Sequence, residues 1–215
     1  MSVISDTLQK GRLLLDSIRF EHTIFALPFA YLGMVLAADG LPTVHQFIWI
    51  TVAMGSARTL AMSANRIIDR YLDALNPRTL SRHLPSGRVK LVEMVAMTLL
   101  SLAIFLVAAS QLNPLAFALA PVAVIVVVGY SYTKRFTWMS HFVLGIADGI
   151  APAGAWIGVT GSLSWEPVLM AFSVATWIGG FDIIYACQDY EFDVKHGLHS
   201  IPQRFGLRNA LLWAK

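Results

Sequence analysis

Long apolar stretches, each close to twenty residues, constrain this chain more than any other feature. Six of them follow one another, at residues 20–38, 47–64, 91–110, 115–132, 140–159 and 167–186. A helix needs about 20 mostly apolar residues to cross the hydrocarbon core of a bilayer, so each stretch predicts one transmembrane helix. A seventh helix is predicted to begin near Leu207. We therefore expect residues 1–215 to form one domain, an all-α polytopic transmembrane helical bundle.

Composition supports a membrane protein and excludes some other classes. Only 13% of the 215 residues are charged, whereas a soluble domain has about a quarter, and the mean hydropathy is +0.62. No acidic or basic tail indicates nucleic-acid binding, and the net charge is a modest +3. The single cysteine, Cys187, excludes an intramolecular disulfide and a metal site with several cysteines.

Basic residues are unevenly distributed among the loops, and their distribution predicts the orientation. Lysine and arginine precede the first apolar stretch and occur in residues 65–90, 134–135 and 195–208, whereas the alternate loops 39–46, 111–114 and 160–166 contain none. Cytoplasmic loops of membrane proteins carry the excess of basic residues. The N terminus and the long polar segments 65–90 and 187–206 are therefore expected in the cytoplasm.

An acidic cluster follows the second apolar stretch. Asn65, Asp69 and Asp73 are spaced i, i+4 and i+8, so their side chains share one face if the segment is helical. Carboxylates beside a bilayer are costly unless they are paired, metal-bound or functional. The cluster is therefore a candidate site for an oxygen-liganded ion.

A second acidic cluster follows the sixth apolar stretch, about 110 residues later. Asp182, Asp189 and Asp193 are spaced i, i+7 and i+11, which predicts one helical face with Tyr185 close to it. For either cluster alone, an ion-paired helix end at the membrane surface is an equally good interpretation. The occurrence of two such clusters on the same side of the bilayer favours a shared site.

The residue types of this site are those that Mg²⁺ prefers. The ion takes octahedral oxygen ligands, and it often binds one or two carboxylates together with substrate phosphates. Cations suited to the phosphate oxygens lie nearby in the sequence. They are Arg66, Arg70, Arg78, Arg82, Lys134, Arg135 and Lys195. The pattern predicts a divalent-metal site for a diphosphate.

Other polar residues inside or beside the apolar stretches are also candidates. Arg58 lies seven residues before Asn65, and we expect it either to bind an acceptor carboxylate or phosphate or to pair with Asp148. Asp148 could instead cap a helix break formed by Gly149 and Pro152. His22 could contact a substrate, with a polar anchor at the membrane interface as the alternative.

Several motifs resemble those of the UbiA superfamily of membrane prenyltransferases. NRIIDRYLD (65–73) resembles its first aspartate-rich motif, NxxxDxxxD, and YACQDYEFDVKHG (185–197) resembles the second, YxxxDxxxD followed by a lysine and a glycine. YSYTKR (130–135) is similar to a stretch between them. RFEHTIFALPFAYLGM (19–34) resembles both the 4-hydroxybenzoate polyprenyltransferases and the branch associated with the futalosine route to menaquinone.

The resemblance implies a Mg²⁺-dependent enzyme of quinone biosynthesis. Asp69, Asp73, Asp189 and Asp193 would be the catalytic metal ligands, supported by Asn65. They would bind the diphosphate of a polyprenyl donor, whose prenyl group is transferred to an aromatic acceptor such as 4-hydroxybenzoate or 1,4-dihydroxy-6-naphthoate. The substrate-binding residues are expected to be Asn65, Arg58, Arg66, Arg70, Lys134, Tyr185, Lys195 and His22.

The resemblance also implies a larger fold and a location. The family has nine transmembrane helices, so we expect that C-terminal helices are missing from this sequence, which ends near the start of the seventh. The bacterial inner membrane, with the site facing the cytoplasm, is the expected location. Two alternatives remain open: a haem or chlorophyll-type prenyltransferase of the same fold, and an ion-coupled transporter with Arg58, Asp148 and Asp182 along an ion path.

Overall fold

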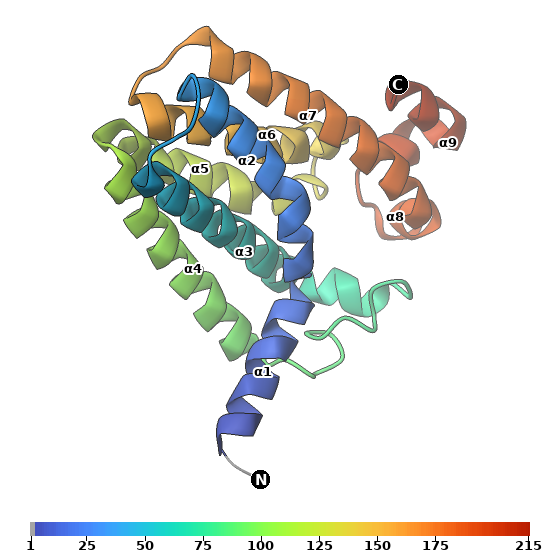
Figure 1. The fold of residues 1–215 in the computed structure, drawn as a ribbon. Helices are drawn as coiled ribbons and strands as arrows, with labels where there is room; N and C mark the ends of the chain where they lie inside the picture. Colours follow the sequence, from blue (N-terminus) through green and yellow to red (C-terminus); the bar gives the residue numbers. More distant parts are fainter. Residues whose placement is uncertain (1–2) are drawn as a thin grey trace.

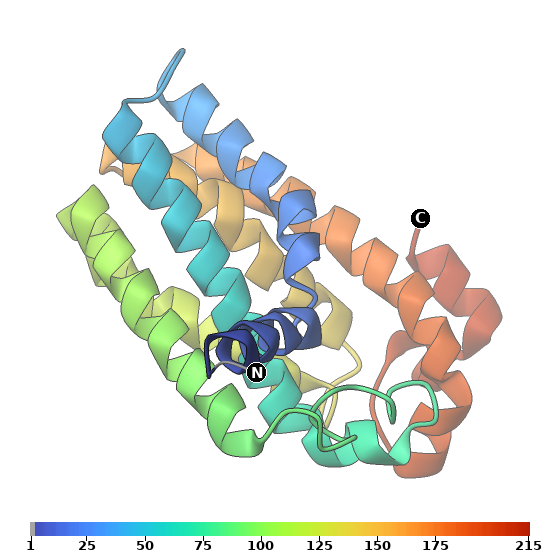
Figure 2. The ribbon, with the colours of Figure 1, turned by 60° about the horizontal axis from the view of Figure 1, so that its bottom comes forward.

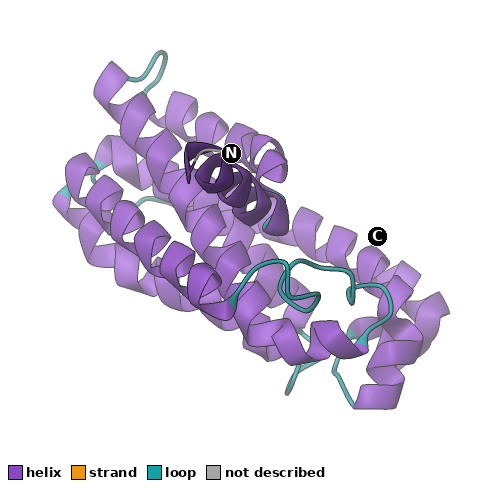
Figure 3. Ribbon diagram, turned by 90° about the horizontal axis from the view of Figure 1, so that it is seen from below, coloured by secondary structure: helices purple, strands orange, loops and turns teal. Residues whose placement is uncertain are grey.

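The computed structural model describes residues 3–215 and, within them, all side chains except those of residues 3–8, 22 and 25. Every regular element in this range is helical, and the helices form one bundle with a smaller group at one end (Figures 1 and 3). In chain order the α-helices and short 3-10 helices (η) are α1 (Val3–Ser17), η1 (Phe20–His22), α2 (Thr23–Ala37), α3 (Val44–Leu75), α4 (Leu91–Leu112), α5 (Pro114–Thr133), α6 (Ser140–Thr160), α7 (Trp165–Ala186), η2 (Cys187–Asp189), α8 (Tyr190–His196) and α9 (Ile201–Trp213).

Five helical segments are long and apolar enough to cross a membrane, which marks the chain as an integral membrane protein. They are α3, α4, α5, α6 and the segment Trp165–His196, which includes α7. The first predicted stretch, 20–38, is shorter than expected. Its helix α2 has 15 residues, because the chain enters it through η1 after Arg19, whose backbone is left-handed at φ 51°. The apolar part of α2 is Ala26–Ala37.

The helix α3 carries the first acidic cluster beyond its apolar stretch. The apolar stretch ends at residue 64, but the helix continues to Leu75, so Asp69 and Asp73 project from its last turns. At the other end, Thr43 accepts a hydrogen bond from the Gln46 backbone N–H, and the Gln46 side chain accepts one from the Thr43 backbone. This capping box satisfies N–H groups that have no partner within the helix.

Glycines allow α6 to lie directly against its neighbour α7. A Cβ atom placed on Gly145 would lie 2.2 Å from the carbonyl oxygen of Ala175, and one on Gly149 would lie 2.5 Å from that of Ala171. Close backbone approach through small residues is the usual way in which membrane helices pack, because lipid provides no hydrophobic driving force between them. The helix break at Gly149 and Pro152 that we considered as an alternative is absent, because α6 is continuous across both positions.

Apolar side chains both fill the bundle and cover its outside. Leu60, Val127 and Ala147 are buried together where α3, α5 and α6 meet. Ile125 and Trp177, by contrast, are 71% and 72% exposed. Exposed apolar side chains on helices of this length and hydropathy are those expected to face lipid.

The C-terminal part is less regular than a single α-helix carrying the second acidic cluster would be. The 3-10 turn η2 ends α7, α8 follows, and Gly197 stops α8 in the left-handed conformation at φ 66°. The predicted helix start near Leu207 agrees with a kink in α9: the helix runs from Ile201 to Trp213, and the non-helical backbone of Gly206, at φ 79°, divides it into two pieces, the second of which follows Gly206. The helices α8 and α9 lie at the same end of the bundle as the loop after α3 (Figures 1 and 2). We call this end of the bundle the acidic end.

Candidate functional site

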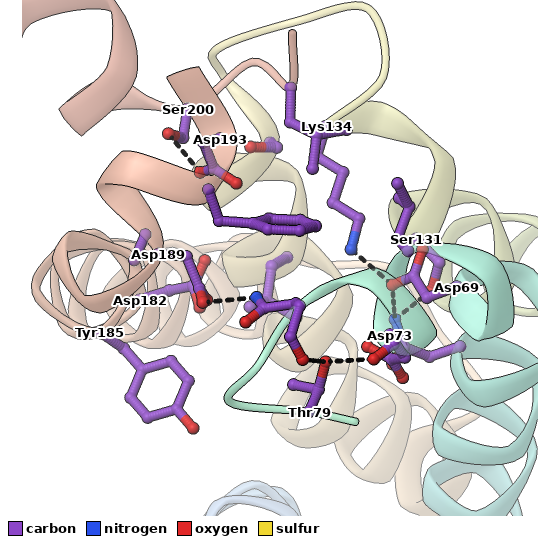
Figure 4. A pocket seen from close by; sticks show the side chains of 18 of the residues that line it. Asp69, Asp73, Thr79, Ser131, Lys134, Asp182, Tyr185, Asp189, Asp193 and Ser200 are labelled. Atoms are coloured by element: carbon purple, nitrogen blue, oxygen red, sulfur yellow. Dashed lines mark hydrogen bonds and ion pairs between the residues drawn. The ribbon is translucent and has the colours of Figure 1, made fainter. Parts of the chain in front are cut away.

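A pocket opens at the acidic end, between α3 and the segment from α7 to α8 (Figure 4). The first turns of α6, the end of α5 and the loop after α3 complete its walls. The predicted site residues that line it are Asn65, Asp69, Asp73, Lys134, Tyr185, Asp189 and Asp193. Asp69 and Asp73 lie on one side of the pocket, and Asp182, Asp189 and Asp193 lie on the other. The structure therefore brings the two acidic clusters into one site.

Asp69 is the most enclosed of these carboxylates, with 3% of its side chain exposed. Lys134 Nζ donates to its Oδ2 at 2.6 Å, and Arg135 Nη2 donates to its Oδ1 at 2.9 Å. The side-chain amide of Asn65 donates to Oδ2 and also to Ser131 Oγ, both at 3.1 Å. Because a buried carboxylate requires partners of opposite charge, these bonds hold the end of α5 against α3.

Asp73 is bonded to the loop that follows its own helix. Arg82 Nη1 donates to both of its carboxylate oxygens, at 2.7 and 2.8 Å. Thr79 Oγ1 donates to the backbone carbonyl of Asp73 at 3.0 Å, and Asn76 ends the helix with an extended backbone. The loop therefore folds back over the last turn of α3 and places two arginines at the pocket.

Asp189 receives the second of these arginines. The Arg78 guanidinium donates to both of its oxygens, through Nε at 2.8 Å and through Nη2, and Asn76 Nδ2 donates at 2.8 Å. Arg78 Nη1 also donates to Tyr185 Oη at 2.9 Å. The hydrogen bonds to Asp189 raise the pKa of Arg78 above its usual value. One loop thus contacts both acidic clusters.

The two remaining acids on this side are bonded without lysine or arginine. Ser200 Oγ donates to Asp193 Oδ2 at 2.8 Å, and Ser200 also caps α9 by accepting from the Gln203 N–H. Asp182 Oδ2 lies 2.7 Å from Nδ1 of His141, a residue at the start of α6 with 3% of its surface exposed. Asp193 and Asp182 are therefore held by the C-terminal segment and by α6.

The donor set fits Mg²⁺ by its chemistry. The pocket offers carboxylate and amide oxygens, and no sulfur or imidazole need take part, which suits a hard cation. Within the described residues, however, no three His, Cys, Asp or Glu side chains are close enough together to hold a metal ion. The acids are instead bonded to the donors named above. Metal binding would therefore exchange these partners, leaving the arginines and Lys134 for the phosphate oxygens.

Other predicted site residues lie outside the pocket lining. Arg66 is buried, and its Nε donates to the Ser17 carbonyl at 3.1 Å. Arg70 donates to the Ile67 carbonyl, and Lys195 is exposed on α8. The side chain of His22 is outside the described residues.

Arg58 lies deeper in the bundle than the acidic clusters. Its Nε is buried without a hydrogen-bond partner in the described part of the chain. The pairing with Asp148 that we considered is absent, since no ion pair within 4.0 Å joins these two described side chains.

Sequence reasoning did not identify several residues of the pocket. Asn76, Ser131, His141 and Ser200 all line it and bond to an acid or to its amide partner. Each comes from a different element, so no spacing in the sequence connects them to the acids. The available signal was their position in or beside stretches that resemble family motifs, as Ser131 lies inside YSYTKR.

Comparisons with known proteins agree with this architecture. The model of the UbiA prenyltransferase family matches residues 26–214. A 4-hydroxybenzoate octaprenyltransferase from Vibrio campbellii (strain ATCC BAA-1116) is 31% identical over 181 residues, which are 84% of this chain and 63% of that protein. The chain therefore spans less than two thirds of that relative's length.

Solved structures share the fold. A UbiA homologue from Aeropyrum pernix K1, in its apo form, has a TM-score of 0.85 and 36% identity, over 91% of this chain and 74% of that one. A UbiA homologue from Archaeoglobus fulgidus, bound to DMAPP and Mg²⁺, has a TM-score of 0.75 and 21% identity, over 94% of this chain and 73% of that one. Because the family model covers most of the sequence and the fold agrees, the chain belongs to the UbiA prenyltransferase family.

Proposed function

We propose that this chain carries the active site of an aromatic polyprenyltransferase, which uses Mg²⁺ and a polyprenyl diphosphate. The observation that carries the proposal is the convergence of four aspartates and three cations, Arg78, Arg82 and Lys134, on one pocket. Asp69 and Asp73 come from α3, while Asp189 and Asp193 come from the segment after α7. A site of this kind, at the mouth of an apolar bundle, suits a ligand with an anionic head and a lipid tail.

Each half of the ligand has a counterpart in the structure. Arg78, Arg82 and Lys134 line the pocket and already bond to carboxylates, so the same donors are placed to bind phosphate oxygens. Bound Mg²⁺ would neutralise the diphosphate leaving group. The residues that would hold the Mg²⁺ are Asp69, Asp73, Asp189 and Asp193, with Asn65. Because Asp69 and Asp73 are anchored on α3, a metal ion that they hold would be fixed in position beside the leaving group.

The acceptor is proposed to bind deeper in the bundle. Arg58 has a buried guanidinium nitrogen without a partner, and an acceptor carboxylate would provide one. The apolar walls would exclude water from the allylic carbon of the donor as its bond to the diphosphate breaks. The ring of the acceptor would then attack that carbon and lose a proton.

The names of relatives support the substrate class. The curated relatives at 27–31% identity are 4-hydroxybenzoate octaprenyltransferases, and the Archaeoglobus fulgidus homologues were solved with DMAPP or GPP and Mg²⁺. We include 1,4-dihydroxy-6-naphthoate as a second acceptor, on the resemblance of residues 19–34. The proposed location is the bacterial inner membrane, with the acidic end facing the cytoplasm.

The proposal is tested by transfer in membrane vesicles that contain the chain. Vesicles are supplied with geranyl diphosphate, Mg²⁺ and either 4-hydroxybenzoate or 1,4-dihydroxy-6-naphthoate, and prenylated product is measured by mass spectrometry. We expect product from one acceptor, its loss with EDTA and its return with excess Mg²⁺. Product formation that is unaffected by EDTA would contradict the metal site, and no product from either acceptor would contradict the function.

A further inference from the structure

A histidine–aspartate pair lies in the wall of the pocket, apart from the predicted metal ligands. His141 Nδ1 is 2.7 Å from Asp182 Oδ2, and both residues line the pocket. His141 has 3% of its surface exposed, whereas the Asp182 side chain is 28% exposed. The histidine is therefore enclosed, and the aspartate is partly exposed to the pocket.

The backbone of the C-terminal segment determines which nitrogen of His141 carries the proton. The N–H of Ile201 donates to His141 Nε2 at 3.2 Å, and a backbone N–H can only donate. Nε2 therefore carries the lone pair, so the ring proton of the neutral imidazole is on Nδ1. That proton is donated to Asp182 Oδ2. The bond leaves Oδ1 of Asp182 without a hydrogen bond from the described residues.

Asp182 also differs from the metal ligands in its partners and its depth. Among the described residues, no lysine or arginine forms an ion pair with it, whereas cations neutralise Asp69, Asp73 and Asp189. It lies on α7, about 6 Å before that helix ends, whereas Asp189 lies beyond the end, in η2, so Asp182 is nearer the apolar part of α7. A reacting carbon that leaves a diphosphate held near Asp189 and enters the apolar bundle would pass close to Asp182.

We propose that Asp182 is the base that accepts the proton released by the aromatic acceptor, and that His141 is the positioning residue that holds its carboxylate. This inference rests on the proposed function.

The bond from the prenyl carbon to the diphosphate oxygen breaks, with its electron pair leaving on the diphosphate. A pair of ring π electrons forms the new carbon–carbon bond. The ring C–H then breaks: its proton moves to Asp182 Oδ1 and its electron pair restores the aromatic ring. Water receives the proton afterwards.

The first test compares Asp182→Asn with the unchanged chain, with geranyl diphosphate, Mg²⁺ and 4-hydroxybenzoate as probes. A positioned base contributes about 10²–10⁴-fold, so we expect kcat to fall by at least about 10²-fold. Affinity for geranyl S-thiolodiphosphate, an analogue that does not ionise, should stay within a factor of about two. With 4-hydroxybenzoate deuterated beside its hydroxyl group, a primary isotope effect should appear or increase, because proton loss becomes the slow step.

The second test distinguishes positioning by His141 from simple packing. Glutamine can donate to Asp182 and accept from the Ile201 N–H, whereas alanine can do neither. We therefore expect His141→Gln to retain more of the wild-type kcat than His141→Ala, with both keeping the thiolodiphosphate affinity. The matched controls are Asp39→Asn and His45→Gln, at the opposite end of the bundle, and they should leave kcat unchanged.

Several results would overturn the inference. Wild-type kcat in Asp182→Asn, an unchanged isotope effect, or a loss of thiolodiphosphate affinity that accounts for the loss of activity would each show that Asp182 is not the base. Equal kcat for His141→Gln and His141→Ala would remove the positioning role. If the unchanged chain forms no product with either acceptor, the proposed function fails and this inference fails with it. That result is distinct from an active chain in which Asp182→Asn leaves kcat unchanged.

Discussion

At the scale of single residues, the acids of the pocket are held by donors from distant parts of the chain. Asp69 is bonded by residues that follow α5, and Asp189 by a loop more than 100 positions earlier. Removing the partner of a buried carboxylate lowers the free energy of unfolding by several kcal/mol. Each pair therefore holds its two elements together as well as neutralising the carboxylate. Three of these cations, Arg78, Arg82 and Lys134, are also the ones that we propose bind the phosphate oxygens.

Lys134 bonds to Asp69 and is also proposed to bind the diphosphate, and its substitution tests the second of these roles. We predict that Lys134→Ala lowers kcat/KM for the diphosphate donor by about 10²-fold or more, because a preorganised positive donor at the leaving group is lost. Lys134→Arg should retain more activity, since it keeps the charge. Steady-state transfer assays in vesicles check this.

The control for this prediction is Lys10→Ala. Lys10 pairs with Glu93 outside the pocket, at 2.5 Å, and its side chain is 53% exposed. We expect its removal to leave donor kinetics unchanged. A Lys134→Ala variant as active as the Lys10→Ala control would contradict a role at the diphosphate.

At the scale of elements, the contact between α6 and α7 brings His141 beside Asp182. A Cβ atom on Gly145 would lie 2.2 Å from a backbone oxygen of α7, which cannot move aside as a flexible side chain could. We predict that Gly145→Ala destabilises the bundle by about 1–3 kcal/mol, the usual cost of overpacking. Thermal unfolding in detergent measures the change.

Gly55→Ala is the matched control, because a Cβ atom on Gly55 of α3 would meet nothing within 4 Å. Alanine is the better helix former by about 1 kcal/mol, so this variant should be neutral or more stable. If both variants had the same unfolding temperature, close approach of α6 and α7 would not be a source of stability.

The elements also show how far the sequence was informative. Apolar length predicted α3 to α7, and the spacing of Asn65, Asp69 and Asp73 correctly predicted a shared face, because both depend on local helical geometry. The second cluster was predicted on one helical face; η2 interrupts the α-helix between Asp182 and Asp189, yet both residues line the pocket. The donors Asn76 and His141 could not be predicted, because tertiary contacts alone bring them to the acids.

At the scale of the whole molecule, charge and hydropathy together imply an orientation. The loop after α3 and the segment 187–208 hold many of the basic residues, and both lie at the acidic end. In a background with Cys187→Ser, we predict that Ser86→Cys reacts with an impermeant thiol reagent only in inverted vesicles. Ser162→Cys, which is exposed at the opposite end, should react in intact cells. The reverse labelling pattern would contradict a cytoplasmic site.

The central claim is that one site joins the two acidic clusters around a metal-bound diphosphate. The most direct measurement is Mg²⁺-dependent prenyl transfer by vesicles containing Asp69→Asn or Asp189→Asn, with Asp39→Asn as the control and protein levels matched. The account predicts that each pocket variant loses at least about 10²-fold in kcat/KM while the control is unchanged, because ligands from both clusters act on the same leaving group. Full activity in either pocket variant would contradict the account.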